Sequence, residues 1–139
     1  MQHQLIRTGT FETNSSSTHS LVIGETGVLF DSLPVNDEGY VVLTGGEFGW
    51  GYDEYDDALT KANYIAVDYQ HTGEDKSRYD ILTGVIMEQT QCAGVIYDLH
   101  PDSYIDHQSS GYGRSLTKDE LRMFIFNPKS TLIVDNDNR

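Results

Sequence analysis

The clearest structural signals of the chain lie in LTKDELRMFIFNPKSTLIVDNDN, residues 116–138. Thr117 can cap a helix, and Glu120 stands three residues later, where a capping box needs its acidic partner. Pro128 ends that helix, because the residue before a proline is driven out of helical geometry. The β-branched run that follows, within 130–138, predicts a strand. The stretch therefore predicts a helix that leads directly into a strand.

Two further helices and several short strands are predicted upstream. The first helix begins near the acids at 53–57 and ends at Gly73, and a second spans about 75–89. Strands are predicted at 20–24, 27–30, 40–45 and 92–99, with a hairpin turn at 25–26 and a short extended piece around Tyr104 and Ile105. Because helices and strands do not alternate regularly, we expect a single α+β domain over residues 1–139, with a mostly antiparallel sheet packed with about three helices.

The composition predicts one folded domain inside the cell. With 139 residues and 37% hydrophobic side chains, the chain can bury a substantial core. No apolar run approaches the roughly 20 residues needed to cross a membrane, and the N-terminus lacks the apolar segment of a secretory signal. A single cysteine, Cys92, excludes an internal disulfide and is expected to fill a small apolar space. We therefore expect a cytoplasmic protein with no membrane contact.

The net charge is the strongest compositional feature. Nine basic residues against 22 acidic ones leave a net charge of −13. Such a surface repels phosphate groups, so we expect no direct binding to nucleic acid. It attracts basic protein surfaces and polyvalent cations. The alternative is that the charge only keeps the protein soluble.

The stretch GGEFGWGYDEYDD, residues 45–57, is the candidate partner-binding site. Its glycines permit sharp turns, its aromatic residues can anchor a contact, and its acids can steer a basic partner. The alternative interpretation is that Phe48 and Trp50 fill the domain's own core. The candidate partner-binding residues are Trp50, Tyr52, Asp53, Tyr55, Asp56 and Asp57.

A second candidate site lies in FETNSSSTHS, residues 11–20, which is unusually rich in hydroxyl groups. A serine needs a base within hydrogen-bonding reach to act as a nucleophile. His19 can be that base for a serine of 15–17, with Glu12 or another acid orienting the imidazole. The alternatives are a loop whose hydroxyl groups bond to their own backbone, or helix capping.

The sequence Asp106-His107-Gln108-Ser109-Ser110 offers an adjacent acid and histidine for acid–base chemistry. The alternative is a turn in which Asp106 bonds to its own backbone. Together with residues 11–20, this loop forms the candidate site of a small enzyme or nucleotide-binding protein. Its candidate catalytic residues are Ser17, His19, Asp106 and His107, and its candidate ligand-binding residues are Glu12, Asn14 and Ser109.

The serine-rich stretch is expected to be ordered rather than a free tail. It begins with Phe11 and runs without a break into the predicted strand at 20–24, so both of its ends are held. Ordering its hydroxyl groups costs backbone entropy, which is offset only if these groups find partners. We therefore predict an irregular segment that lies against residues 106–110 and 135–138.

No metal or cofactor site is predicted. The five histidines form no pair at helical spacing and no cluster with cysteine. No glycine-rich loop ends in Gly-Lys-Ser or Gly-Lys-Thr, which argues against a P-loop ATPase. Residues 135–138 superficially match the opening of a calcium loop, but the glycine and distal glutamate that such a loop needs do not follow.

Four stretches together resemble a known group of proteins: FETNSSSTHS, GGEFGWGY, YIDHQSSG and FIFNPKSTLIVDNDN. They are similar to segments of uncharacterised small proteins of bacteriophages and prophages that open with F-E-T-N-S-S-S-x-H. The resemblance implies expression in a bacterial cytoplasm, and it supplies no catalytic residues. Small phage proteins often bind and disable host machinery. The resemblance therefore implies a binding or inhibitory protein that acts on a host or anti-phage-defence factor, here one with a basic surface.

Overall fold

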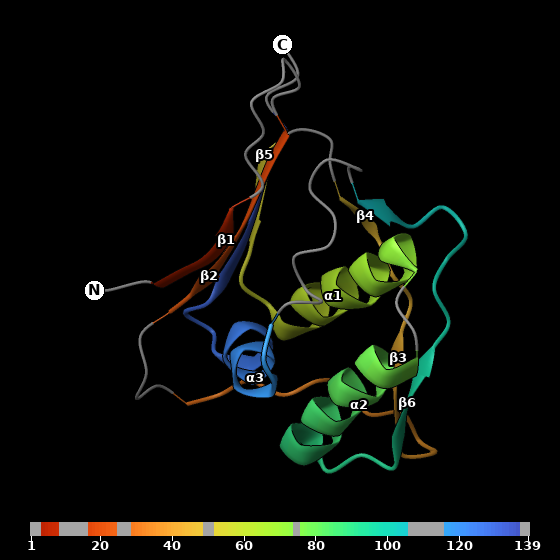
Figure 1. Ribbon diagram of the computed structural model, residues 1–139. Coiled ribbons are helices and arrows are strands. Elements are labelled where there is room, and N and C mark those ends of the chain that lie inside the picture. Colours follow the sequence, from red (N-terminus) through yellow and green to blue (C-terminus); the bar gives the residue numbers. More distant parts are fainter. Residues whose placement is uncertain are drawn as a thin grey trace.

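The computed structural model describes residues 4–8, 17–24, 29–48, 52–73, 76–105 and 116–136, and it mixes helices and strands (Figure 1). The elements follow in the order β1 (Gln4–Thr8), β2 (Ser17–Ile23), β3 (Tyr40–Leu43), β4 (Glu47–Phe48), β5 (Tyr52–Tyr55), α1 (Ala58–Thr72), α2 (Lys76–Thr90), β6 (Gly94–Tyr97), β7 (Tyr104–Ile105), α3 (Lys118–Phe126) and β8 (Thr131–Asn136). The predicted α+β class is confirmed.

The largest sheet is antiparallel and has the strand order β1-β2-β8-β5. We call it sheet A. Its register places Leu21 of β2 and Tyr55 of β5 on either side of Leu132 of β8. Because side chains alternate along a strand, the buried Leu21, Leu132 and Val134 define the face of the sheet that meets the helices. β8 thus lies inside the sheet, between strands from much earlier in the chain.

Two short parallel pairs complete the strands: β3 with β6, and β4 with β7. The prediction of a mostly antiparallel sheet is therefore correct for sheet A but not for these two pairs. Parallel neighbours need a long crossover connection, and here α1 and α2 supply it between β3 and β6. Only residues 44–46 separate β3 from β4, so the second pair continues the first beyond a break.

The three helices begin and end close to where local signals predict. The Asp57 side chain accepts a hydrogen bond from Thr60 N at 2.8 Å and caps α1, and Gly73 ends it in the left-handed region at φ 70°. α2 spans 76–90 where about 75–89 was expected. The predicted capping box of α3 is confirmed, with both Thr117 and Glu120 hydrogen bonds present.

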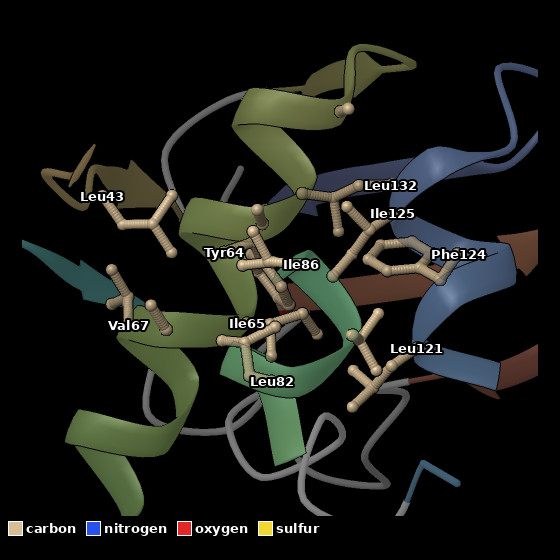
Figure 2. Close-up of a cluster of buried hydrophobic side chains, with 14 of the residues drawn as sticks. Leu43, Tyr64, Ile65, Val67, Leu82, Ile86, Leu121, Phe124, Ile125 and Leu132 are labelled. Atoms are coloured by element: carbon tan, nitrogen blue, oxygen red, sulfur yellow. The ribbon is translucent and has the colours of Figure 1, made fainter. Parts of the chain in front are cut away.

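α1 is the central element of the molecule. Figure 1 shows it between sheet A on one side and the parallel pairs on the other. All residues from Lys61 to Tyr69 are buried. Figure 2 shows how α1 contributes Tyr64, Ile65 and Val67 to a cluster that also draws on β3, α2, α3 and β8. Each fully buried leucine or isoleucine of this cluster contributes about 1.5–3 kcal/mol.

A buried lysine connects α1 to the turn between α3 and β8. Lys61 Nζ donates hydrogen bonds to the carbonyl oxygens of Asn127 at 3.0 Å and Ser130 at 2.8 Å, and it lies 5.8 Å from the centre of the Phe124 ring. The same turn holds the end of β2, because Gly24 N donates to Ser130 Oγ at 3.1 Å. These contacts fix sheet A against the helices.

Several strand predictions need correction. Residues 29–30 are not in a strand, and β2 pairs with β1 and β8. The predicted hairpin turn at 25–26 and residues 27–28 lie outside the described residues. β6 is shorter than the predicted 92–99, and its residues are half-buried or exposed rather than buried, since one face of the β3–β6 pair is open. Asp53 and Tyr55 belong to β5 and not to the first helix. Cys92 is buried, as expected.

Candidate functional site

Polar ends of three strands meet at one end of sheet A. In the register of β2 and β8, Ser17 is opposite Asn136, Thr18 is opposite Asp135 and His19 is opposite Val134. The end of the serine-rich stretch therefore lies against residues 135–136, as predicted, although 17–19 form a regular strand and not an irregular segment. The rest of that prediction, for 11–16 and for contact with 106–110, lies outside the described residues. Figure 1 shows this end of the sheet extending beyond the helices.

β5 brings the predicted partner-binding stretch to the same end of the sheet. Tyr52 is opposite Asp135 and Asp53 is opposite Val134, on the side of β8 away from β2. His19 and Asp53 therefore occupy register positions on the same face, two strands apart, or roughly 10 Å. The stretches 11–20 and 45–57 were predicted as separate sites, and pairing with β8 makes their described parts, 17–19 and 52–53, neighbours.

The carboxylates that follow along β5 are exposed. Asp53 and Glu54 lie on β5, which within the described residues pairs only with β8 and so forms an edge of sheet A. Asp56 and Asp57 follow in the connection to α1 and are also exposed. We call Asp53, Glu54, Asp56 and Asp57 the acidic edge.

Two members of the acidic edge also make structural hydrogen bonds. Asp56 Oδ1 accepts a hydrogen bond from Thr131 Oγ1 at 2.9 Å, which connects the strand end to β8. Asp57 caps α1. Its partial burial raises its pKa, but hydrogen bonds from Thr60 outweigh that effect and leave the pKa below its usual range. Asp57 is therefore ionised at neutral pH and adds to the surface charge.

The aromatic residues of this stretch divide between core and surface. Phe48 is buried, and its ring packs edge-on against Tyr64 at 5.0 Å and Tyr55 at 6.2 Å. Phe48 thus fills the domain's own core, as the alternative interpretation held. Tyr55 is half-buried, and burial together with nearby Asp53 raises its pKa. Tyr55 therefore exposes only part of its ring to a partner.

Several predicted site residues cannot be placed. Trp50 lies outside the described residues, and so do Glu12, Asn14, Asp106, His107 and Ser109. Ser17 and His19 are placed by the backbone of β2 alone. The catalytic set of Ser17, His19, Asp106 and His107 therefore stays a prediction.

A polar cleft that sequence analysis missed lies at the break between the two parallel pairs. Its volume is about 350 Å³, and its lining is Thr44, Gly45, Gly46, Glu47, His100, Asp102 and Ser103. The turn at 100–103 closes with a hydrogen bond from Ser103 N to His100 O at 2.9 Å. Ser103 Oγ accepts from Gly46 N at 3.1 Å, and Gly45 has φ 84°, which favours glycine.

His100 in this cleft has a fixed hydrogen-bonding direction. Its Nδ1 accepts a hydrogen bond from Asp102 N at 3.1 Å, so the neutral ring carries its proton on Nε2. The neighbouring acids Glu47 and Asp102 repel anions, and Gly45 N is already bonded to Asn63 Oδ1 at 2.9 Å. The cleft therefore lacks the free backbone donors of a phosphate site.

The described residues contain no group of three or more histidine, cysteine or acidic side chains suited to hold a metal ion. The signal for this cleft was present as Gly-Gly after a strand and His-Pro-Asp-Ser after another. Only the long-range pairing of the two loops turns those signals into a site.

Comparison with protein-family models, with curated proteins and with solved structures finds no match for this chain. Its function must therefore be argued from its own geometry. Among the described helices, none has both the length and the apolar character needed to cross a bilayer.

Proposed function

We propose that the protein binds a host or anti-phage-defence protein with a basic surface and thereby inhibits it, and that the acidic edge is the contact. The observation that carries this proposal is the exposure of four carboxylates within residues 53–57, on an edge strand and its continuation. The overall charge of −13 adds a long-range attraction for a basic partner.

The edge position supports the proposal in a second way. An edge strand presents backbone donors and acceptors on its unpaired side, where an extended segment of a partner can add to the sheet. Carboxylates along such an edge block pairing with copies of the same acidic chain, because like charges repel. They favour a basic segment instead, so the same residues give both selectivity and solubility.

The test uses variants in which exposed carboxylates are replaced by amides of the same shape, so that charge is removed and the fold is kept. Immobilised protein is incubated with bacterial lysate at low and moderate salt, and captured proteins are identified. We expect a basic protein to be retained at low salt and released as salt rises, because exposed charges are screened. The variant Asp53→Asn/Glu54→Gln should lower capture about fivefold, since it removes two exposed charges without touching the bonds of Asp56 and Asp57.

A matched control separates the site from the net charge. Asp37 and Glu38 are exposed in the loop before β3, and Asp37→Asn/Glu38→Gln makes the same change in charge elsewhere. This control should capture as much partner as the unchanged protein. The proposal fails if no partner is retained at either salt, or if both double variants lose capture equally.

The alternative function is a small hydrolase, phosphoesterase-like enzyme or nucleotide-binding protein. It needs Asp106 and His107 beside Ser17 and His19, and the first two lie outside the described residues. It stays a prediction from sequence.

A further inference from the structure

A pocket with a different character lies between α2 and the start of α3. Its volume is about 340 Å³, within the usual size range of small-molecule sites. Its lining in the described residues is Arg78, Asp80, Ile81, Gly84, Leu116, Thr117 and Lys118. None of these residues belongs to the acidic edge, so the pocket requires an explanation of its own.

Gly84 keeps this pocket open at a cost to the helix. It lies in the interior of α2, where glycine is about 1 kcal/mol less favourable than alanine. The described glycines with positive φ are Gly39, Gly45 and Gly73, so the backbone at Gly84 does not require glycine. Packing does not require it either, because a Cβ at Gly84 would meet no atom within 4 Å. What the missing side chain leaves is space beside Ile81 and Leu116.

The charges around the pocket are unusual for this molecule. Two cations, Arg78 and Lys118, line it together with one acid, Asp80, which is paired with Lys76 at 3.1 Å. The lining thus carries a net charge of +1 in a chain of net charge −13.

Lys118 is available to a ligand at little cost. Its Nζ contacts Glu88 Oε2 at 2.8 Å, and Arg122 holds the other oxygen of Glu88 at 3.2 Å. Glu88 therefore keeps a partner if Lys118 turns toward the pocket. The Thr117 hydroxyl, by contrast, is committed to Glu120 N at 3.1 Å.

We propose that this pocket binds a small molecule that has an apolar body and one carboxylate group. The apolar body fills the space at Gly84 against Ile81 and Leu116, and the carboxylate pairs with Lys118 and Arg78. A neutral analogue loses the charge-assisted hydrogen bonds, and a cationic one meets repulsion from both side chains. The site lies on other elements than the acidic edge, so either proposal can fail without the other.

The probe for this site is 4-phenylbutyrate, with 4-phenylbutanol as its neutral counterpart. Each is titrated into the isotope-labelled full chain, and backbone amide resonances are followed. We expect saturable shifts at Ile81, Gly84 and Lys118 with the carboxylate, and about tenfold weaker binding of the alcohol. No saturable shift at these amides, or equal binding of both probes, overturns the proposal.

Substitutions inside and beside the pocket complete the test. Gly84→Leu places a side chain in the open space and should abolish phenylbutyrate binding, and Lys118→Gln should reduce its affinity to that of the alcohol. Lys129→Gln, exposed in the turn before β8 and outside the lining, should bind as the unchanged protein does. If Gly84→Leu does not fold, Gly84→Ala decides, since its single methyl group should weaken binding severalfold. Unchanged binding by the Gly84 variant and by Lys118→Gln contradicts the proposal.

Discussion

Lys61 has the most unusual surroundings of the described residues. Its side chain is fully buried, and burial lowers its pKa from 10.5 to about 8, while Asp56 and Asp31 partly oppose that fall. Both hydrogen bonds to carbonyl oxygens survive loss of the proton, because a neutral amine still has two N–H donors. The protein therefore holds a charged group at neutral pH that its interior disfavours.

This gives a pH dependence of stability whose sign can be worked out. Between pH 8 and 10.5 the unfolded chain keeps the Lys61 proton that the folded protein has lost, so the free energy of unfolding rises with pH. The Lys61 contribution should reach about 2 kcal/mol between pH 7 and 10. Above pH 10, Tyr97 acts in the opposite direction, because burial raises its pKa to about 12.

Urea unfolding at several pH values between 7 and 10 measures the Lys61 contribution. The free energy of unfolding of Lys61→Met should not show this rise between pH 7 and 10. A variant at an exposed lysine, Lys76→Met, should show the same rise as the unchanged protein. Parallel pH curves for the Lys61→Met variant and the unchanged protein would show that the lysine titrates normally in the folded state.

Sequence periodicity predicted the helix that carries Lys61 but not the role of this residue. The recurrence of Tyr55, Ala58, Ala62, Ile65 and Tyr69 predicted one apolar stripe along this helix. α1 is instead enclosed on all sides, so Lys61, Asn63 and Asp68 are buried with it. The partners that make this tolerable come from residues 127 and 130, which no local pattern connects to α1.

At the scale of elements, helices were predictable and strand pairing was not. Caps, stop residues and a 3.6-residue period are local signals. They placed both ends of α2 and α3 and the end of α1 within one or two residues, whereas the start of α1 was predicted too early. β1, β4 and β5 were missed, because they are short and gain their stability from partners distant in sequence. The acidic edge was recognised as a group of residues, but its position on an edge strand depends on that pairing.

Two glycines should respond in opposite ways to the same substitution. A Cβ at Gly24 would collide with the backbone oxygen of Lys129, at the point where β2 meets the turn before β8. Gly24→Ala should therefore lower stability by about 1–3 kcal/mol, as overpacking does. Gly84→Ala should raise it by about 0.5–1 kcal/mol, because α2 gains a better helix former in open space. Melting temperatures of the two variants decide, and a loss of stability at both positions would contradict this account.

At the scale of the whole molecule, charge is unevenly distributed. On α2 and α3, four cations are matched by four acids: Lys76, Arg78, Lys118 and Arg122 against Asp80, Glu88, Asp119 and Glu120. The acidic edge lies on β5 and in its connection to α1, whose start is beside α3 in Figure 1, and it contains four acids and no cation. The proposed basic partner would be attracted to the acidic edge, and the proposed anionic ligand to the lining of the pocket between α2 and α3. The two proposed sites therefore differ in the sign of their local charge.

The integrity of the molecule depends on β8, which joins β2 to β5 and faces the helices. Leu132 is fully buried on the helix-facing side, and its neighbour Ile133 is half-buried on the other face. Leu132→Ala should cost about 2–5 kcal/mol, because it leaves a cavity where sheet A, α1 and α3 meet. Ile133→Ala should lower the free energy of unfolding by clearly less, since its side chain loses a smaller contact area.

Urea unfolding followed by both circular dichroism and tyrosine fluorescence measures the two losses of stability, and the two signals should change together. A larger loss at Ile133 than at Leu132 would mean that β8 presents its other face to the helices, because a shift of one residue in register exchanges the faces of a strand.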